Sequence, residues 1–220
     1  PLLKYLGAEK AVEITRRCLQ IHGGVGYTRD YGAEKLLRDS LVLPIYEGTS
    51  QIQALMAMKD TLGGIMKNPQ GFLKKIAQAR WRSRSTRDPL ERRVAKLQAR
   101  SLKVQQFLIT KTATDKFRSI QGKPLSEWPR RFLKNWNPKR DFAYAMLHAE
   151  HLTHLLADEA ICELLLEQAL EFPERRAVLE AYLDRAEPRS KYLAALITSR
   201  GHRLLSQLKA GQDEQQRESA

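Results

Sequence analysis

The sequence predicts an all-α protein. Apolar side chains recur at three- and four-residue steps along most of the chain, which is the spacing of amphipathic helices. Proline and glycine clusters separate these stretches, and none of them indicates a β-strand. With 220 residues, 42% of them hydrophobic, the chain can bury a sizeable core. We expect three parts: residues 1–70, a basic and then acidic helical extension over 71–210, and a disordered tail over 211–220 without apolar anchors.

The first part begins with a helix that ends at a glycine-rich bend. Its apolar rows are Ala8, Val12, Thr15 and Leu19, and beside them Ile14, Cys18 and Ile21. Gly23, Gly24 and Gly26 are expected to end it. A short helical piece follows over 30–41, and Pro44 interrupts it.

A further helix is expected from Ser50. Its inner face would carry Ile52, Leu55, Met56 and Leu62, with Lys59 as the one polar residue. Gly63-Gly64 and residues 68–71 are expected to break this helix, which places a domain boundary there.

The extension opens on a strong helix start. Asp88 is expected as the N-cap, Pro89 in the first turn and Glu91 as the third residue of a capping box. The apolar stripe that follows contains Leu90, Val94, Leu97, Val104 and Leu108. A loop is expected at 122–124.

Asn137-Pro138 repeats the cap-and-proline pattern before a second long helix. Its inner face is expected to include Phe142, Met146, Ala149, Leu152, Leu156 and Leu165. Pro173 and Pro188 are expected to separate two further helices.

The net charge of +13 comes from one segment. Residues 72–140 contain 20 basic and 4 acidic side chains, whereas residues 141–220 contain 9 and 14. Three interpretations stay open: a solvated helix face paired with Asp158, Glu159, Glu163 and Glu167, an anionic membrane surface met by the basic residues around Trp81, or nucleic acid.

The compartment is only loosely constrained. Cys18 and Cys162 lie in helical patterns and do not form a disulfide framework, which favours the cytoplasm or the mitochondrial matrix, with peripheral membrane contact as an addition. Because the chain starts at Pro1 inside a helical pattern, we expect a piece of a larger protein. His148, His151 and His154 lie at three-residue steps on one helix, so at most two could share a metal ion and no metal site is expected.

The most informative stretch for chemistry runs from Gln20 to Gln51. It reads Gln20-Ile-His-Gly-Gly-Val-Gly-Tyr27, then Arg38-Asp39, then Ile45-Tyr-Glu-Gly-Thr-Ser-Gln51. Glu47 is a candidate general base, since apolar flanking groups can exclude water and Gly48 leaves room for a ligand. Taken alone, however, the pattern favours an exposed turn glutamate that helps to cap the next helix. The glycines lack the preceding strand of a dinucleotide-binding fingerprint.

These three motifs, in this order, resemble the C-terminal domain of flavin-dependent acyl-CoA dehydrogenases. The resemblance implies that residues 1–70 are the C-terminal part of a catalytic helical domain, and that Glu47 takes the α-proton of an acyl-CoA. It implies substrate contacts for Tyr46 and Gly48. It implies FAD contacts for Thr49, Ser50 and Gln51, and for a loop that reaches a neighbouring subunit: Gln20, Ile21, His22, Gly23 and Gly24.

The activity implied is FAD-dependent α,β-dehydrogenation of a fatty acyl-CoA to a trans-2-enoyl-CoA, as in fatty acid β-oxidation. The implied partners are the acyl-CoA substrate, an electron-transfer flavoprotein and further copies of the enzyme, as a dimer or tetramer. The flavin site needs elements outside these residues, so we expect the isolated chain to be catalytically incomplete. The alternative is a helical membrane-surface or protein-interaction module without catalysis of its own.

Overall fold

The computed structural model describes residues 1–121, 128, 136–201 and 203–207, and these are helical without a strand, as expected. The chain divides into two compact units, Pro1–Lys59 and a second that begins at Asp60. The first holds α1 (Leu2–His22), the 3₁₀ turns Gly23–Tyr27 and Arg29–Tyr31, α2 (Ala33–Ser40) and the start of α3 (Ser50–Lys67). The second holds the rest of α3, α4 (Pro69–Ser85), α5 (Pro89–Ile120), α7 (Pro138–Asp141), α8 (Ala143–Leu147), α9 (Ala149–Glu171), the 3₁₀ turn Pro173–Arg175 and α10 (Arg176–Ser199).

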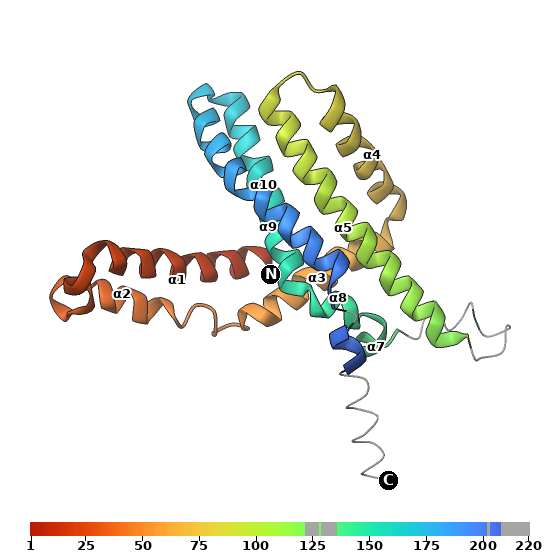
Figure 1. The fold of residues 1–220 in the computed structure, drawn as a ribbon, viewed down its shortest axis with the longest axis horizontal. Coiled ribbons are helices and arrows are strands. Elements are labelled where there is room, and N and C mark those ends of the chain that lie inside the picture. The colour runs from red at the N-terminus through yellow and green to blue at the C-terminus, as the bar shows by residue number, and fades with distance from the viewer. Residues whose placement is uncertain (122–127, 129–135, 202, 208–220) are drawn as a thin grey trace, which may run out of the picture. The chain divides into compact units, whose positions relative to one another are not determined.

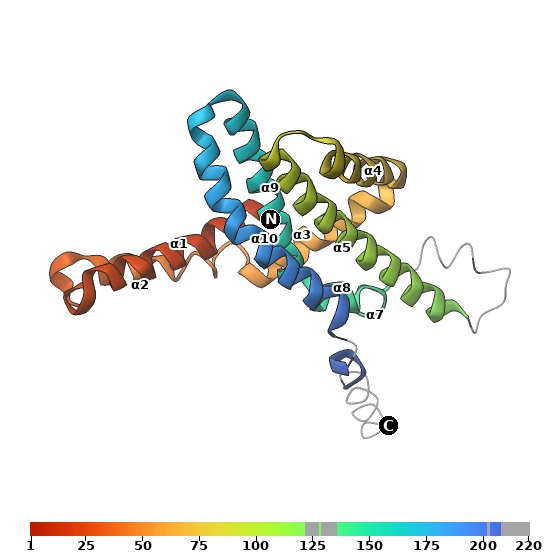
Figure 2. The same cartoon turned by 45° about the horizontal axis from the view of Figure 1, so that its top comes forward.

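In the first unit, α1 and α2 form a helical hairpin that the glycine-rich bend closes, and both views show the two helices side by side (Figures 1 and 2). The Thr15 hydroxyl lies 2.8 Å from the Ser40 hydroxyl across this hairpin. The expected helix end at Gly23 is confirmed, because Gly23 takes the left-handed φ of 63°. The second expected apolar row is largely not buried, since Ile14 and Ile21 are exposed.

Helix α3 differs from its expectation in length and in face. It continues through Gly63 and Gly64 to Lys67, because a glycine costs a helix only about 1 kcal/mol relative to alanine. Its buried face carries Ala54, Ala57, Met58, Leu62 and Ile65, so only Leu62 of the expected apolar set is fully buried. The helix ends before Asn68, whose side chain accepts a hydrogen bond from the Gly71 amide and caps α4.

The second unit is a bundle in which α5 packs against α4, α9 and α10 (Figure 1). The expected cap of α5 is confirmed, as the Asp88 carboxylate accepts from the amides of Leu90 and Glu91. All five residues of the expected α5 stripe are buried. One core cluster joins α5, α9 and α10: Leu90, Val94, Leu97, Cys162, Leu166, Ala169, Leu179, Leu183 and Ala186.

Two expectations for the acidic part are wrong. The long helix expected after Pro138 is three pieces, broken at Phe142 and at His148. His148 instead places its Nε2 atom 3.0 Å from the Arg200 carbonyl oxygen, a tertiary contact that a helix pattern does not reveal. Pro188 lies inside α10 rather than between helices, so the helix continues across one missing N–H donor. The loop at 122–124 and the tail at 211–220 lie outside the described residues.

Candidate active site around Glu47

Glu47 lies in a backbone conformation that few side chains adopt. Its φ is 52°, which makes it the one described non-glycine residue with positive φ, and Gly48 follows with φ of 91°. A Cβ atom on residue 48 would lie 2.9 Å from the Gln53 Nε2 atom. Glycine is therefore required here by the turn itself, in addition to the ligand access that the sequence suggested.

Gln53 holds this turn and was not identified from the sequence. Its Nε2 atom donates a hydrogen bond of 2.9 Å to the Glu47 carbonyl oxygen, and its side chain is buried at the start of α3. The Ser50 amide donates to the Pro44 carbonyl oxygen at 2.9 Å, which closes the loop from the other side. Gln53 could have been found from the sequence only as a polar residue on the buried face of α3, which is a weak signal.

Helix α1 anchors both sides of the turn. The Lys4 ammonium donates to the Leu43 carbonyl oxygen at 2.5 Å and lies 4.9 Å from the centre of the Tyr46 ring. The Ser50 hydroxyl donates to the Glu9 carboxylate at 2.5 Å. The backbone that presents Glu47 is thus fixed at several points within the first unit.

The Glu47 side chain is exposed, and so are its apolar neighbours. Ile45 is 64% exposed and Tyr46 46%. The expectation that these flanking groups exclude water is therefore not met by the described residues of this unit. A base for carbon acids needs a covering surface.

The Glu47 amide is a candidate donor for a substrate. Among the described residues it has no hydrogen-bond acceptor, whereas the amides of Ile45 and Tyr46 both donate to the Val42 carbonyl oxygen. The turn can therefore offer one carboxylate and one free N–H from the same residue.

The glycine-rich bend lies at the other end of α1. From Glu9, which contacts the Glu47 turn through Ser50, to Gln20 the helix rises about 16 Å. The bend is tightly built: a Cβ on Gly26 would lie 2.6 Å from His22 Cβ and 2.8 Å from the Leu19 carbonyl oxygen. The structure thus separates the two halves of the expected cofactor set, and both halves cannot meet one small group around Glu47.

The expected FAD-contacting residues differ in how available they are. All five residues from Gln20 to Gly24 are exposed, as are Thr49 and Gln51. The Thr49 hydroxyl accepts a hydrogen bond of 3.3 Å from the Ile52 amide, and the Ser50 hydroxyl donates a hydrogen bond to the Glu9 carboxylate. The exposed set fits a large ligand with many hydrogen-bonding groups, and Ser50 serves first to hold the turn.

Arg38 and Asp39 have a local structural role. The Arg38 guanidinium bonds Glu34 one turn earlier at 3.2 Å and lies 3.8 Å from Asp39. Arg38 and Asp39 are exposed and Glu34 is partly exposed, so such pairs contribute little.

In the second unit, part of the basic segment pairs internally. Arg82 bonds Glu91, and Arg93 bonds both Asp184 and Glu187. Of the carboxylates expected from sequence, Glu163 interacts electrostatically with Arg82 and Lys75, whereas Asp158 pairs with Arg189. Other cations of α4 remain exposed around Trp81, which is 70% exposed.

The histidines and the buried cysteine have structural surroundings. His148 is buried, with its Nδ1 atom 3.4 Å from that of His151. Across the described residues, no three side chains of metal-binding type are grouped as a metal site. Burial raises the pKa of the Cys162 thiol to about 12, so it is not a nucleophile.

None of the described helices combines the length and apolar character needed to cross a bilayer.

Comparison with known proteins gives sequence matches that cover less than a third of the chain. Residues 1–62 match the family model of the acyl-CoA dehydrogenase C-terminal domain. The chain is 48% identical over 61 residues to a 3-(aryl)acrylate reductase of Clostridium sporogenes, covering 28% of this chain and 16% of that protein. It is 46% identical over 63 residues to an acyl-CoA dehydrogenase of Bacillus subtilis, covering 29% and 17%. The chain therefore spans about one sixth of the length of these relatives.

One solved structure extends the likeness to both units. An acyl-CoA dehydrogenase from Bacillus anthracis, crystallised with FAD, matches 94% of this chain and 34% of its own, with a TM-score of 0.58 and 19% identity. At this identity the likeness concerns the fold alone.

Proposed function

Since residues 1–62 match the family model of the acyl-CoA dehydrogenase C-terminal domain, we propose that Glu47 is the base that removes the α-proton in the FAD-dependent conversion of a fatty acyl-CoA to a trans-2-enoyl-CoA. The observation that carries this proposal is the positive φ of both Glu47 and Gly48, in a turn that the Gln53 side chain holds by a hydrogen bond to the Glu47 carbonyl oxygen. Strained backbone that the surroundings hold in place is concentrated at functional sites.

Each group of the turn has a defined task in this reaction. The Glu47 carboxylate accepts the proton from Cα, while its own free amide donates to the thioester carbonyl and makes that proton more acidic. Gly48 keeps the approach open, and Tyr46 lies beside it as an exposed ring that the substrate can contact. FAD, when bound, supplies the hydride acceptor.

The cofactor would be held by two separate sets of residues. Thr49 and Gln51 lie beside the base, and Gln20–Gly24 lie at the far end of α1. Because about 16 Å of helix separates them, the second set suits the cofactor of a neighbouring copy, which makes a homo-oligomer part of the proposal. Exposed apolar side chains along α1, α2 and the Glu47 turn offer surface for such packing: Ile14, Ile21, Leu36, Val42 and Ile45.

The acyl substrate and the electron partner are also proposals. One relative, 44% identical over 55 residues, is a subunit of a caffeyl-CoA reductase–Etf complex from Acetobacterium woodii. Its name supports an electron-transfer flavoprotein as the partner here. Because relatives include reductases, the assay should follow both acyl-CoA oxidation and enoyl-CoA reduction.

The test is Glu47→Gln in the complete enzyme that contains this chain. We expect FAD content to be retained and kcat to fall at least a hundredfold, since a positioned general base contributes about 10²–10⁴. Glu13→Gln is the matched control, because Glu13 is an α1 glutamate that pairs with Lys10 and Arg17 on the surface. Near-normal turnover of Glu47→Gln would exclude Glu47 as the base. Flavin absorbance retained by the isolated 220-residue chain would contradict the expectation that it is incomplete.

A membrane surface is the second candidate function, and it concerns α4. Leu73 is 59% exposed and Trp81 70%, with the exposed cations Lys74, Arg80 and Arg84 between and beside them. Such a surface suits anionic lipid, where each cation contributes about 1 kcal/mol. Co-sedimentation with anionic and neutral vesicles tests it, and equal binding to both that salt does not weaken would reject it.

A further inference from the structure

A groove between α5 and α10 lies away from every residue discussed as catalytic. Its volume is about 410 Å³, and it is lined by Arg100, Lys103, Val104, Phe107, Lys191, Ala194, Ala195 and Thr198. All eight belong to the second unit. The groove therefore lies between two helices that pack against each other within one unit.

The two helices run in parallel, and their contacts change in kind along their length. Near the start, Arg93 of α5 bonds Asp184 at 2.7 Å and Glu187 at 3.0 Å. Two turns later, Arg100 meets only the Ser190 hydroxyl, at 2.6 Å. The α10 carboxylates therefore all precede the part of the helix that lines the groove, whereas cations are still present there.

Arg100 is only partly satisfied. It is half-buried, and burial lowers the pKa of its guanidinium, with Glu187 countering part of that effect. Within the described part of the chain, Ser190 is its sole hydrogen-bond partner and no carboxylate pairs with it. Ser190 is itself fixed, since its hydroxyl donates to the Glu187 carbonyl oxygen at 2.8 Å. A guanidinium has five N–H donors, so most of those on Arg100 are available to a ligand.

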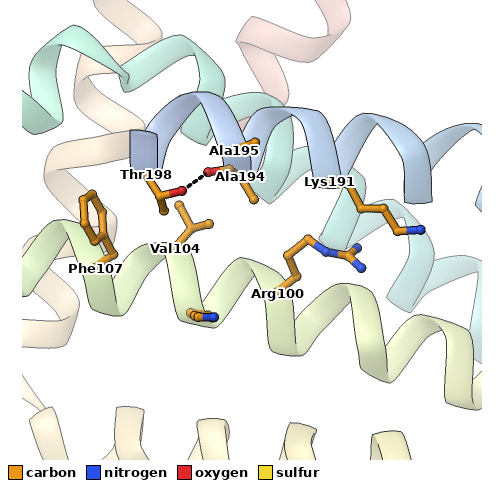
Figure 3. A pocket seen from close by; sticks show the side chains of 8 residues that line it. Arg100, Val104, Phe107, Lys191, Ala194, Ala195 and Thr198 are labelled. Atoms are coloured by element: carbon orange, nitrogen blue, oxygen red, sulfur yellow. Dashed lines mark hydrogen bonds between the residues drawn. The ribbon is translucent and has the colours of Figure 1, made fainter. Parts of the chain in front are cut away.

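The groove is polar at one end and apolar at the other. Figure 3 shows Arg100 and Lys191 together at one end, Val104, Ala194 and Ala195 in the middle, and Phe107 and Thr198 at the other end. The Thr198 hydroxyl donates to the Ala194 carbonyl oxygen of its own helix, so this end offers few free polar groups. From Arg100 to Phe107 the helix rises about 10 Å, which suits a medium-chain alkyl group.

We propose that this groove binds an aliphatic carboxylate, with its head on Arg100 and Lys191 and its chain along Val104 and Ala194 toward Phe107. The planar guanidinium fork matches a carboxylate in two hydrogen bonds. The alkyl chain replaces water over the apolar floor. Lys103 also lines the groove and adds a further positive charge.

Calorimetric titration of the purified protein with octanoate tests the proposal. We expect octanoate to bind at least tenfold more tightly than acetate, which lacks the chain, and than 1-octanol, which lacks the charge. Arg100→Met should weaken octanoate binding at least tenfold. Lys96→Met is the matched control, because Lys96 is exposed on the same helix and does not line the groove; it should change binding less than twofold.

Two further variants keep the test decisive if Arg100→Met fails to fold. Ala195→Trp fills the groove from its exposed rim and should abolish binding, whereas Arg100→Lys keeps the charge, loses the fork and should weaken binding severalfold. Equal binding of octanoate and octanol, or equal effects of Lys96→Met and Arg100→Met, would overturn the proposal. Tenfold tighter binding of octyl phosphate would overturn the carboxylate assignment. The measurement uses neither flavin nor turnover, so its outcome and that of Glu47→Gln are independent.

Discussion

Asp88 and Arg176 join the first turns of α5 and α10. The carboxylate accepts from the amides of Leu90 and Glu91, which caps α5, and it also receives two guanidinium hydrogen bonds, at 2.8 and 3.0 Å, from the first residue of α10. One side chain therefore links the starts of two parallel helices. The register of these helices, followed along their length, places Arg93 opposite Asp184 and Glu187 and Arg100 opposite Ser190.

The Asp88 pair predicts a stability loss in acid. Hydrogen bonds from Arg176 and the two amides lower the pKa of Asp88 to about 2, against 3.8 ordinarily. Its contribution is fully present above pH 3.8 and is lost as the pH falls toward 2. Asp88→Asn keeps a capping oxygen but loses the ion pair, so it should destabilise the protein by about 1 kcal/mol at pH 7 and by little at pH 2. Urea unfolding at both pH values measures this, with Asp60→Asn at an exposed site as control; equal losses at both would contradict the assignment.

Glu159 predicts the opposite pH dependence. Its Oε2 atom is buried without a hydrogen-bond partner among the described residues, and burial raises its pKa to about 7, although Ser101 and Lys75 oppose this. The native state therefore holds the proton more tightly than the unfolded chain does, and stability falls as the pH rises from 4.5 through 7. Glu159→Gln should stabilise the protein by about 2–3 kcal/mol at pH 8 and hardly at pH 4.5. Denaturant-induced unfolding at the two pH values measures this difference, with Glu167→Gln at an exposed position as control. A gain in stability of the same size at both pH values would argue against burial as the cause.

The two glycines of the first bend should differ sharply in tolerance. A Cβ on Gly26 would meet His22 Cβ at 2.6 Å and a backbone oxygen at 2.8 Å, whereas a Cβ on Gly24 meets nothing within 4 Å. Gly26→Ala should cost about 1–3 kcal/mol and loosen the end of the hairpin, while Gly24→Ala should be nearly neutral. Hydrogen exchange of the amides in this bend reports the difference directly. Similar exchange in the two variants would show that the bend relaxes without cost.

Gln53 is predicted to position Glu47 without touching the substrate. Gln53→Met keeps the length of the side chain and removes the donor to the Glu47 carbonyl oxygen. In the complete enzyme, kcat should fall about tenfold with little change in KM, since a misplaced base costs the chemical step. Gln70→Met, at an exposed position of α4, is the control. A change confined to KM would assign Gln53 to substrate binding instead.

Several elements could be predicted from the sequence because they depend on local interactions. The Asp88-Pro89 cap, the apolar stripe of α5 and the end of α1 at Gly23 depend on neighbours within one or two turns. Elements that depend on distant partners were misjudged. The helix expected through His148 breaks where that side chain meets Arg200, and α3 buries Ala54 and Ala57 rather than the larger Ile52 and Met56.

The sequence by itself determined the helical class, because the spacing of apolar residues is a short-range pattern. It also contains the motifs between Gln20 and Gln51 that resemble acyl-CoA dehydrogenases, and that resemblance makes Glu47 the candidate base. Only the tertiary structure decided how Glu47 is presented: its left-handed φ, the Gln53 hydrogen bond and the separation from Gln20–Gly24 along α1. It also decided where the excess positive charge matters. Arg93 is neutralised by α10 and Arg100 is not, because the register of two helices far apart in the chain sets which side chains meet, and a periodic pattern contains no such information.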